Sequence, residues 1–210
     1  MFNQLKQVAL AAALAMSGLT AAQAATCIGN CGESTVADGV VTLPAGATSY
    51  NWISTEMGLE GAGQLAGYGG TNGSSLTSDA FYAAAGATVE FYFNYVTSDG
   101  AGYADYAWAQ LVGASSSTTL FTARTKPEGN IAPGFDLPEV NATLTPGNVE
   151  IIGGGPVWAP LGGSSGSCYS AGCGYTGWIK STYTVAESGT YQLAFGVTNY
   201  LDTAYQSGMA

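Results

Sequence analysis

Hydrophobic and polar residues alternate along much of this chain in short runs that are separated by Gly, Ser, Asn and Pro. Residues 88–96 (TVEFYFNYV) show the pattern most clearly. In an extended strand successive side chains point to opposite faces, so Val89, Phe91, Phe93 and Tyr95 would share one face. This segment is therefore the strongest strand prediction in the chain.

Several further segments carry the same strand pattern. They are residues 106–112, 118–123, 149–152, 177–185 and 190–199, with weaker examples at 39–43 and 50–54. Helical periodicity is nearly absent after the first 24 residues. Many short strands separated by turn residues indicate an all-β fold, an antiparallel β-sandwich or jelly roll.

Two kinds of connection are predicted between these strands. The turn at residues 187–190 lies between two long strands, so 177–185 and 190–199 are expected to form a hairpin. Residues 125–146 and 153–175 read as long loops rich in Pro or in Gly and Ser. Loops of this length in a compact domain are often functional, and a plain surface insertion is the alternative.

The first 24 residues have the pattern of a signal peptide. Lys6 supplies the positive charge, residues 8–16 form a short apolar run, and residues 22–24 (AQA) give a small-x-small cleavage site after Ala24. The apolar run is shorter than the roughly 20 residues of a membrane helix, and no later segment is long and apolar enough. We therefore expect an exported protein without a membrane span after removal of the leader.

The remaining residues, 25–210, are expected to form one domain. A length of 186 residues, from 210 less 24, fits a single β-sandwich. The chain ends after residues 207–210 (SGMA), where a further strand would begin. This end predicts that the domain is truncated at its C-terminus.

The charge of the chain excludes one class of partner. Without Lys6 it carries three basic and fourteen acidic residues, a net charge of −11. Binding to phosphate backbones needs clustered Lys and Arg, so no nucleic-acid partner is expected.

Four cysteines follow the leader in two close pairs, Cys27 with Cys31 and Cys168 with Cys173. An even number of cysteines in an exported chain indicates disulfides. Three pairings are possible, and the two local ones are favoured because their partners are already close in sequence. A zinc site is the alternative, but the spacings are wider than CxxC and the chain has no His.

Catalytic motifs are scarce in the sequence. The absence of His excludes Ser-His-Asp and Cys-His arrangements, and no GxSxG motif occurs. Two of the fourteen acids could still form the carboxylate pair of a glycoside hydrolase. A non-catalytic protein is expected, and a secreted carboxylate-dependent glycoside hydrolase is the alternative.

Two sets of residues are candidates for binding. Asp99, Asp105 and Asp202 lie in predicted loops, where carboxylates and carbonyls are the ligands that Ca²⁺ prefers. The alternative is that these carboxylates accept hydrogen bonds from local backbone N–H groups. Trp158, expected to be exposed between two prolines, and Tyr175 are candidates for binding a sugar or a protein. Trp108 and Trp178 lie within strand patterns and are expected in the core.

Several motifs resemble those of exported β-sandwich proteins of the PEP-CTERM class. They are CIGNCG at 27–32, NYVTSDG at 94–100, DYAW at 105–108, GCGYTGW at 172–178 and GVTNYLDTAYQSG at 196–208. The resemblance implies a surface or extracellular-matrix protein of a Gram-negative bacterium that makes exopolysaccharide. Polysaccharide or other copies of the chain would be its partners, and no catalytic activity is implied. The sorting tail of that class, with its Pro-Glu-Pro motif and membrane helix, is absent from this chain.

Overall fold

The structure, a computed structural model, describes residues 24–210 and is all-β, as the sequence predicts. The predicted signal peptide falls almost entirely outside these residues. Within 24–210 the helical elements are two short 3₁₀ turns, η1 (Ala101–Tyr103) and η2 (Ala159–Ser164). No helix in this part of the chain is long and apolar enough to cross a membrane.

One layer is a seven-stranded antiparallel sheet. Its order is β1 (Ala24–Ile28), β5 (Asn72–Ser78), β17 (Gly189–Thr198), β9 (Tyr106–Val112) and β10 (Ser117–Arg124), with β4 (Leu59–Glu60) on β5 and β6 (Phe81–Ala83) on β17.

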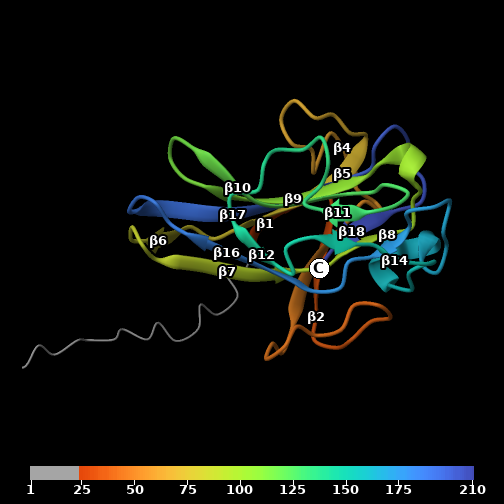
Figure 1. The fold of residues 1–210 in the computed structure, drawn as a ribbon, viewed down its shortest axis with the longest axis horizontal. Coiled ribbons are helices and arrows are strands. Elements are labelled where there is room, and N and C mark those ends of the chain that lie inside the picture. The colour runs from red at the N-terminus through yellow and green to blue at the C-terminus, as the bar shows by residue number, and fades with distance from the viewer. Residues whose placement is uncertain (1–23) are drawn as a thin grey trace, which may run out of the picture.

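The other layer consists of two sheets and faces the first (Figure 1). A three-stranded sheet has the order β12 (Thr143–Thr145), β16 (Ile179–Thr184) and β7 (Thr88–Phe93). A six-stranded sheet has the order β14 (Ile152–Gly153), β15 (Gly174–Tyr175), β8 (Tyr95–Thr97), β18 (Ser207–Met209), β3 (Tyr50–Ser54) and β2 (Asn30–Ser34). A small separate ladder joins β11 (Asn130–Ala132) and β13 (Val149–Glu150).

The main hydrophobic core lies between these layers. Phe93 and Ile179 from one layer pack in the same cluster as Phe121 and Val197 from the other. The predicted inward face of 88–96 is largely confirmed, since Val89, Phe93 and Tyr95 are buried. Burial of these large apolar side chains is the main force that holds two sheets together.

Strand β9 is buried on both faces. Ala107 and Ala109 face the core, and Trp108 on the other face is covered by the loop at 61–70. The Trp108 indole N–H donates to the Gly63 carbonyl at 2.7 Å. The expectation that Trp108 fills the core is confirmed, whereas Trp178 is only partly buried.

The strongest predicted strand is divided at Asn94. Residues before it form β7 and residues after it form β8, which belong to different sheets. The backbone of Asn94 exchanges two hydrogen bonds with Ala210, at 2.8 and 3.0 Å. This pairing lets one continuous segment serve two sheets, which alternation alone could not indicate.

The predicted hairpin around residues 187–190 is wrong. β16 pairs with β7 and β12, whereas β17 pairs with β5, β6 and β9. The turn therefore connects the two layers instead of two neighbouring strands. The hydrophobic faces of both strands point into the space between the layers. Two strands paired in one sheet and two strands in opposite layers therefore give the same sequence pattern.

Other boundaries also differ from the sequence predictions. Residues 39–43 form no strand and contribute only an isolated bridge between Asp38 and Val41. Residues 149–152 are divided between β13 and β14. β5 was not predicted because its sequence, NGSSLTS, is mostly polar; it is a strand because β1 and β17 supply hydrogen-bonding partners on both sides.

The chain end is itself a strand. β18 pairs with β3 on one side and β8 on the other, and its residues are buried. The strand expected to begin there is thus present within residues 207–209.

Both favoured disulfides are confirmed. Cys27 bonds to Cys31 and Cys168 to Cys173, with Cα–Cα distances of 6.2 and 5.6 Å. The first joins β1 to β2, and the second closes a short loop before β15.

Candidate functional site

Three loops meet at one end of the six-stranded sheet. They are residues 98–105 between β8 and β9, 154–173 between β14 and β15, and 199–206 between β17 and β18. Backbone hydrogen bonds join all three: the N–H of Tyr169 donates to the Ser98 carbonyl at 3.0 Å, and the N–H of Ser98 donates to Gln206 at 3.1 Å. The loops therefore form one connected surface.

Each loop contributes one tyrosine to an aromatic cluster. The ring of Tyr169 lies 5.5 Å from that of Tyr103 and 5.0 Å from that of Tyr205, measured between centroids. Tyr169 is 49% exposed and Tyr205 is 37% exposed, while Tyr103 is half-buried. We call Tyr103, Tyr169 and Tyr205 the tyrosine cluster. It presents aromatic surface to solvent at the place where the loops meet.

The disulfide Cys168–Cys173 frames the central member of this cluster. Tyr169 follows Cys168 directly, within the loop that the disulfide closes. The N–H of Ala101 donates to the carbonyl of Ala171, in the same closed loop, at 2.9 Å. The cross-link and this bond restrict the positions that the Tyr169 ring can adopt.

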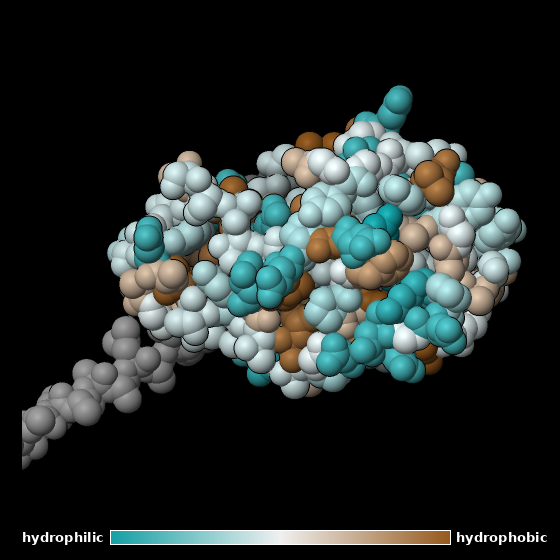
Figure 2. Space-filling view, turned by 45° about the horizontal axis from the view of Figure 1, so that its top comes forward, coloured by the Kyte–Doolittle hydropathy of each residue, from teal (hydrophilic) through white to brown (hydrophobic). Residues whose placement is uncertain are grey.

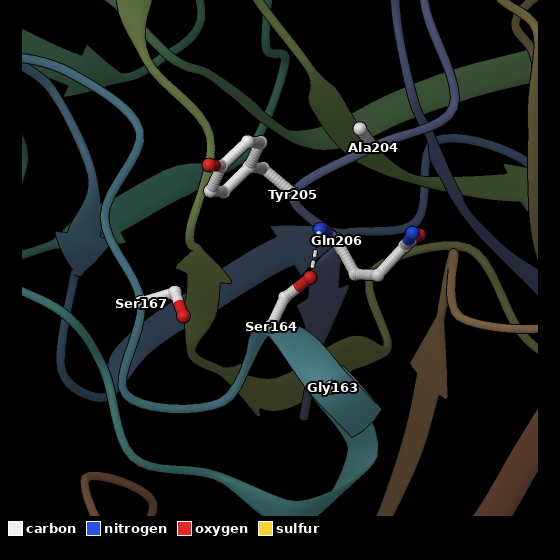
Figure 3. Close-up of a pocket in the computed structure, with 6 residues that line it drawn as sticks. All are labelled: Gly163, Ser164, Ser167, Ala204, Tyr205 and Gln206. Atoms are coloured by element: carbon white, nitrogen blue, oxygen red, sulfur yellow. Dashed lines mark hydrogen bonds between the residues drawn. The ribbon is translucent and has the colours of Figure 1, made fainter.

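A shallow polar hollow adjoins Tyr205 (Figure 3). Its volume is about 360 Å³, and its lining consists of Gly163, Ser164, Ser167, Ala204, Tyr205 and Gln206. The Ser164 hydroxyl accepts a hydrogen bond from the backbone N–H of Gln206 at 3.2 Å, which ties the two walls together. We call this feature the tyrosine hollow. It combines an aromatic ring with hydroxyl and amide groups.

A second hollow lies on the other side of the 199–206 loop. Its volume is about 450 Å³, and its lining consists of Glu60, Gly61, Gln64, Gly70, Thr71, Asn72 and Thr203. The Thr71 hydroxyl donates to the Asp202 carbonyl, which fixes the loop to this wall. Thr203 and Ala204 are consecutive, so both hollows adjoin the same loop.

Asp105 lies beneath these loops in a network of hydroxyl groups. One of its carboxylate oxygens accepts from the Tyr200 N–H at 2.8 Å and the other from the Ser207 hydroxyl at 2.6 Å. The Ser207 oxygen lies 2.8 Å from the Thr97 hydroxyl. The carboxyl of Asp105 is fully buried, and burial followed by the charge of Asp99 raises its pKa well above the usual range.

Asp99 is also buried, and only one of its two carboxylate oxygens has a hydrogen-bond partner. One carboxylate oxygen accepts from the Gly100 N–H at 2.6 Å, while the other has no hydrogen-bond partner. Burial is the main cause that raises its pKa, to about 7, and the charge of Asp202 adds to it. Within residues 24–210 the ion pair that forms is Lys180 with Glu90, so neither Lys nor Arg pairs with Asp99.

Asp202 is the carboxylate nearest to solvent among the three. It is partly exposed, and its side chain accepts a hydrogen bond from the Ala204 N–H at 3.1 Å. This is the local backbone hydrogen bond that the sequence analysis gave as the alternative to calcium binding. The neighbouring Tyr103 raises the pKa of the Tyr169 phenol, and the charges of Asp99 and Asp202 raise it further. A negative potential therefore extends to the exposed tyrosine.

The three residues proposed from sequence for calcium thus lie in loops that meet. The structure brings Asp99, Asp105 and Asp202 within electrostatic reach of each other. In the described part of the chain, however, no group of three or more Asp, Glu, His or Cys residues is arranged to hold a metal ion. Calcium binding stays a prediction.

The expectation that Trp158 is exposed is wrong. Its side chain is fully buried and packs edge-on against Trp52, with ring centroids 6.5 Å apart. It also covers Gly208 of β18, where an added Cβ would lie 2.5 Å from the indole ring. The neighbouring residues Val157 and Ala159 are exposed, but the Trp158 side chain turns inward because the six-stranded sheet offers it an apolar face. Tyr175 in β15 is partly buried and packs on the same hydrophobic cluster.

The tyrosine cluster was missed at the level of sequence. Its members are 36 to 102 residues apart in the chain, as their numbers 103, 169 and 205 show, and they belong to a set of 13 tyrosines. The one local signal is the position of Tyr169 next to Cys168. Comparison of the chain with protein-family models, with curated proteins and with solved structures finds no match.

Proposed function

We propose that this chain is an exported, non-catalytic protein of a bacterial cell surface or extracellular matrix, and that it binds a saccharide at the tyrosine cluster. The observation that supports this most directly is the meeting of three tyrosines from three loops beside a hollow lined by hydroxyl groups. The leader-like N-terminus, the two disulfides and the resemblance to PEP-CTERM proteins support export and surface location.

The chemistry of the cluster suits a sugar ring. Tyrosine offers a flat apolar face for the C–H groups of a pyranose and a phenol for its hydroxyls. Ser164, Ser167 and Gln206 add donors and acceptors around the hollow. Bonds between the loops hold these groups in place before a ligand arrives, which lowers the entropic cost of binding.

A screen of the oxidised chain, residues 25–210, against an array of polysaccharides tests this function. Tyr169→Ala is expected to weaken binding by about tenfold, because a stacked aromatic residue contributes about 1 to 2 kcal/mol. Tyr82→Ala is the matched control, since Tyr82 is 70% exposed but lies on β6, away from the three loops. Equal loss in both variants, or no binding to any polysaccharide, would refute the proposal.

Self-association is the second form of a surface role that the sequence suggests. The face seen in Figure 2 carries hydrophobic residues only in small patches among hydrophilic ones. Stable protein interfaces bury large continuous surfaces. Edge strands such as β2 offer unpaired backbone groups for such assembly, and sedimentation of the free chain at increasing concentration measures it.

The alternative of a carboxylate-dependent glycoside hydrolase needs two acids at the substrate. Asp99 and Asp105 are the acids with raised pKa, but both are buried beneath the loops. Incubation of any bound polysaccharide with the protein, followed by measurement of new reducing ends, separates the two functions. Turnover that is lost in Asp99→Asn would favour the hydrolase.

A further inference from the structure

We infer that the saccharide bound at the tyrosine hollow is one that carries protonated amino groups, such as a polymer of glucosamine units. This inference rests on the proposed function and adds the chemical class of the ligand. It is argued from the aromatic rings, the carboxylates around them and the positions of the three basic residues.

The tyrosine cluster can bind a cation through its ring faces. An ammonium group within about 6 Å of an aromatic centroid is attracted by the negative face of the ring. The centroid of the Tyr169 ring lies 5.5 Å from that of Tyr103 and 5.0 Å from that of Tyr205. A sugar amine that approaches Tyr169 would therefore meet more than one ring.

Carboxylates lie within and beside the loop that carries Tyr205. Asp202 is partly exposed and its charge reaches Tyr169, while Glu60 lines the second hollow. Asp99 lies below with an unpartnered, buried carboxylate oxygen. A ligand that spans both hollows would pass from Tyr205 over residues 202–204 toward Glu60.

The basic residues of the described chain do not offset this charge. Arg124 is buried, with its guanidinium 4.7 Å from the Tyr200 ring centroid, and Lys180 pairs with Glu90 at 3.3 Å. The backbone of Lys126 lies near Gly172, but its ammonium lies 5.9 Å from the Phe135 ring centroid. An acidic saccharide would meet no cation in the lining of either hollow, whereas an amine-bearing one meets the Tyr205 ring in the first hollow and the Glu60 carboxylate in the second.

The test compares two ligands of equal length that differ at one group. Isothermal titration measures binding of a glucosamine hexasaccharide and of its fully N-acetylated form at about pH 5.5, where the sugar amines are mostly charged. The amine form is expected to bind at least about tenfold more tightly, and the difference should shrink as salt is added.

Variants locate the effect. Asp202→Asn is expected to weaken binding of the amine form by about two- to fivefold and to leave the acetylated form unchanged. Glu187→Gln, which removes one charge at the turn between β16 and β17, is the matched control and should change neither. Spermidine, an amine without a sugar ring, should bind more weakly than the hexasaccharide.

The outcomes separate this inference from the proposed function. Tighter binding of the acetylated form, or equal binding of both forms, would overturn the amine inference and leave saccharide binding intact. Equal losses in Asp202→Asn and Glu187→Gln would overturn the placement at the tyrosine hollow. Binding of neither hexasaccharide, together with an empty polysaccharide array, would overturn both proposals.

Discussion

Asp99 and Asp105 bring two carboxyl groups into the protein interior without a basic partner. Charged carboxylates are costly to bury unless they are paired, and the usual response is that the group holds a proton. Asp105 has two hydrogen bonds to its oxygens, whereas one oxygen of Asp99 has none. The pair is therefore the point in the molecule where stability depends most on pH.

The first prediction concerns Asp99. Its pKa is raised from 3.8 to about 7, so between these values the folded chain holds a proton that the unfolded chain has released. Stability is then highest near pH 4 and falls as the pH rises to about 7, by on the order of 2 to 4 kcal/mol. Asp99→Asn should remove much of this fall and be more stable than the parent chain at pH 8.

Urea unfolding at a series of pH values in buffer with EDTA measures this effect. Asp79→Asn is the control, because Asp79 is an exposed carboxylate outside the three loops. A parent chain whose free energy of unfolding rises between pH 4 and 7 would contradict the assignment of a raised pKa.

At the scale of elements, the disulfides act on different parts of the molecule. Cys27–Cys31 connects β1 in one layer to β2 in the other. Cys168–Cys173 closes a loop that carries Tyr169 and adjoins η1 through the bond from Ala101 to Ala171. Each cross-link closes a short loop, so its contribution to unfolding entropy is modest and its main effect is local.

The second prediction follows from this difference. Replacement of Cys168 and Cys173 by Ser should release the Tyr169 loop and weaken saccharide binding by about three- to tenfold, since binding would then carry the cost of ordering the loop. The paired replacement of Cys27 and Cys31 by Ser should leave the affinity unchanged.

Titration calorimetry of both variants, with circular dichroism to confirm that each is folded, provides the comparison. A larger loss of affinity in the Cys27 and Cys31 variant would show that the tyrosine loop does not depend on its own disulfide.

At the scale of the whole molecule, the chain combines a sandwich core with an acidic surface. Residues 25–210 carry a net charge of −11, and two of the three loops that converge at one end of the six-stranded sheet carry Asp99, Asp105 and Asp202. A bound cation would relieve repulsion there, and so would protons on the buried carboxyls. If a bound cation lowers the charge, calcium raises the melting temperature, whereas if protons lower it, calcium has no effect.

The calcium prediction implies that the melting temperature at pH 7.5 rises by several degrees in millimolar Ca²⁺ and returns to its starting value with EDTA, because an ion that binds only the folded chain stabilises it. Asp99→Asn should lose the response, and Mg²⁺ serves as the control ion. An unchanged melting temperature would refute calcium binding at these carboxyls.

Several features could be read from the sequence because they depend on local chemistry. Alternation in residues 106–112 and 190–199 matches β9 and β17 closely, since successive side chains of a strand point to opposite faces. The cysteine pairs could be read because their partners are four and five residues apart. The polar strand β5 could not, since its extended form depends on neighbours distant in sequence.

The candidate site could be predicted only in part from the sequence. The sequence identified the loops of Asp99, Asp105 and Asp202 but chose Trp158 as the exposed aromatic residue. Whether an aromatic side chain in a loop turns outward depends on the apolar surface within its reach, and β18 provides such a surface for Trp158.

By itself, the sequence determined that the chain is strongly acidic and forms many short strands, and it favoured two local disulfides, because these properties follow from residue types and short spacings. The tertiary structure decided that β7 and β8 enter different sheets, that β16 and β17 lie in opposite layers, and that Tyr103, Tyr169 and Tyr205 meet. Alternation specifies which face of a strand is apolar but not which strand lies beside it. Contacts between distant loops follow from that pairing, so the site becomes visible only in the folded chain.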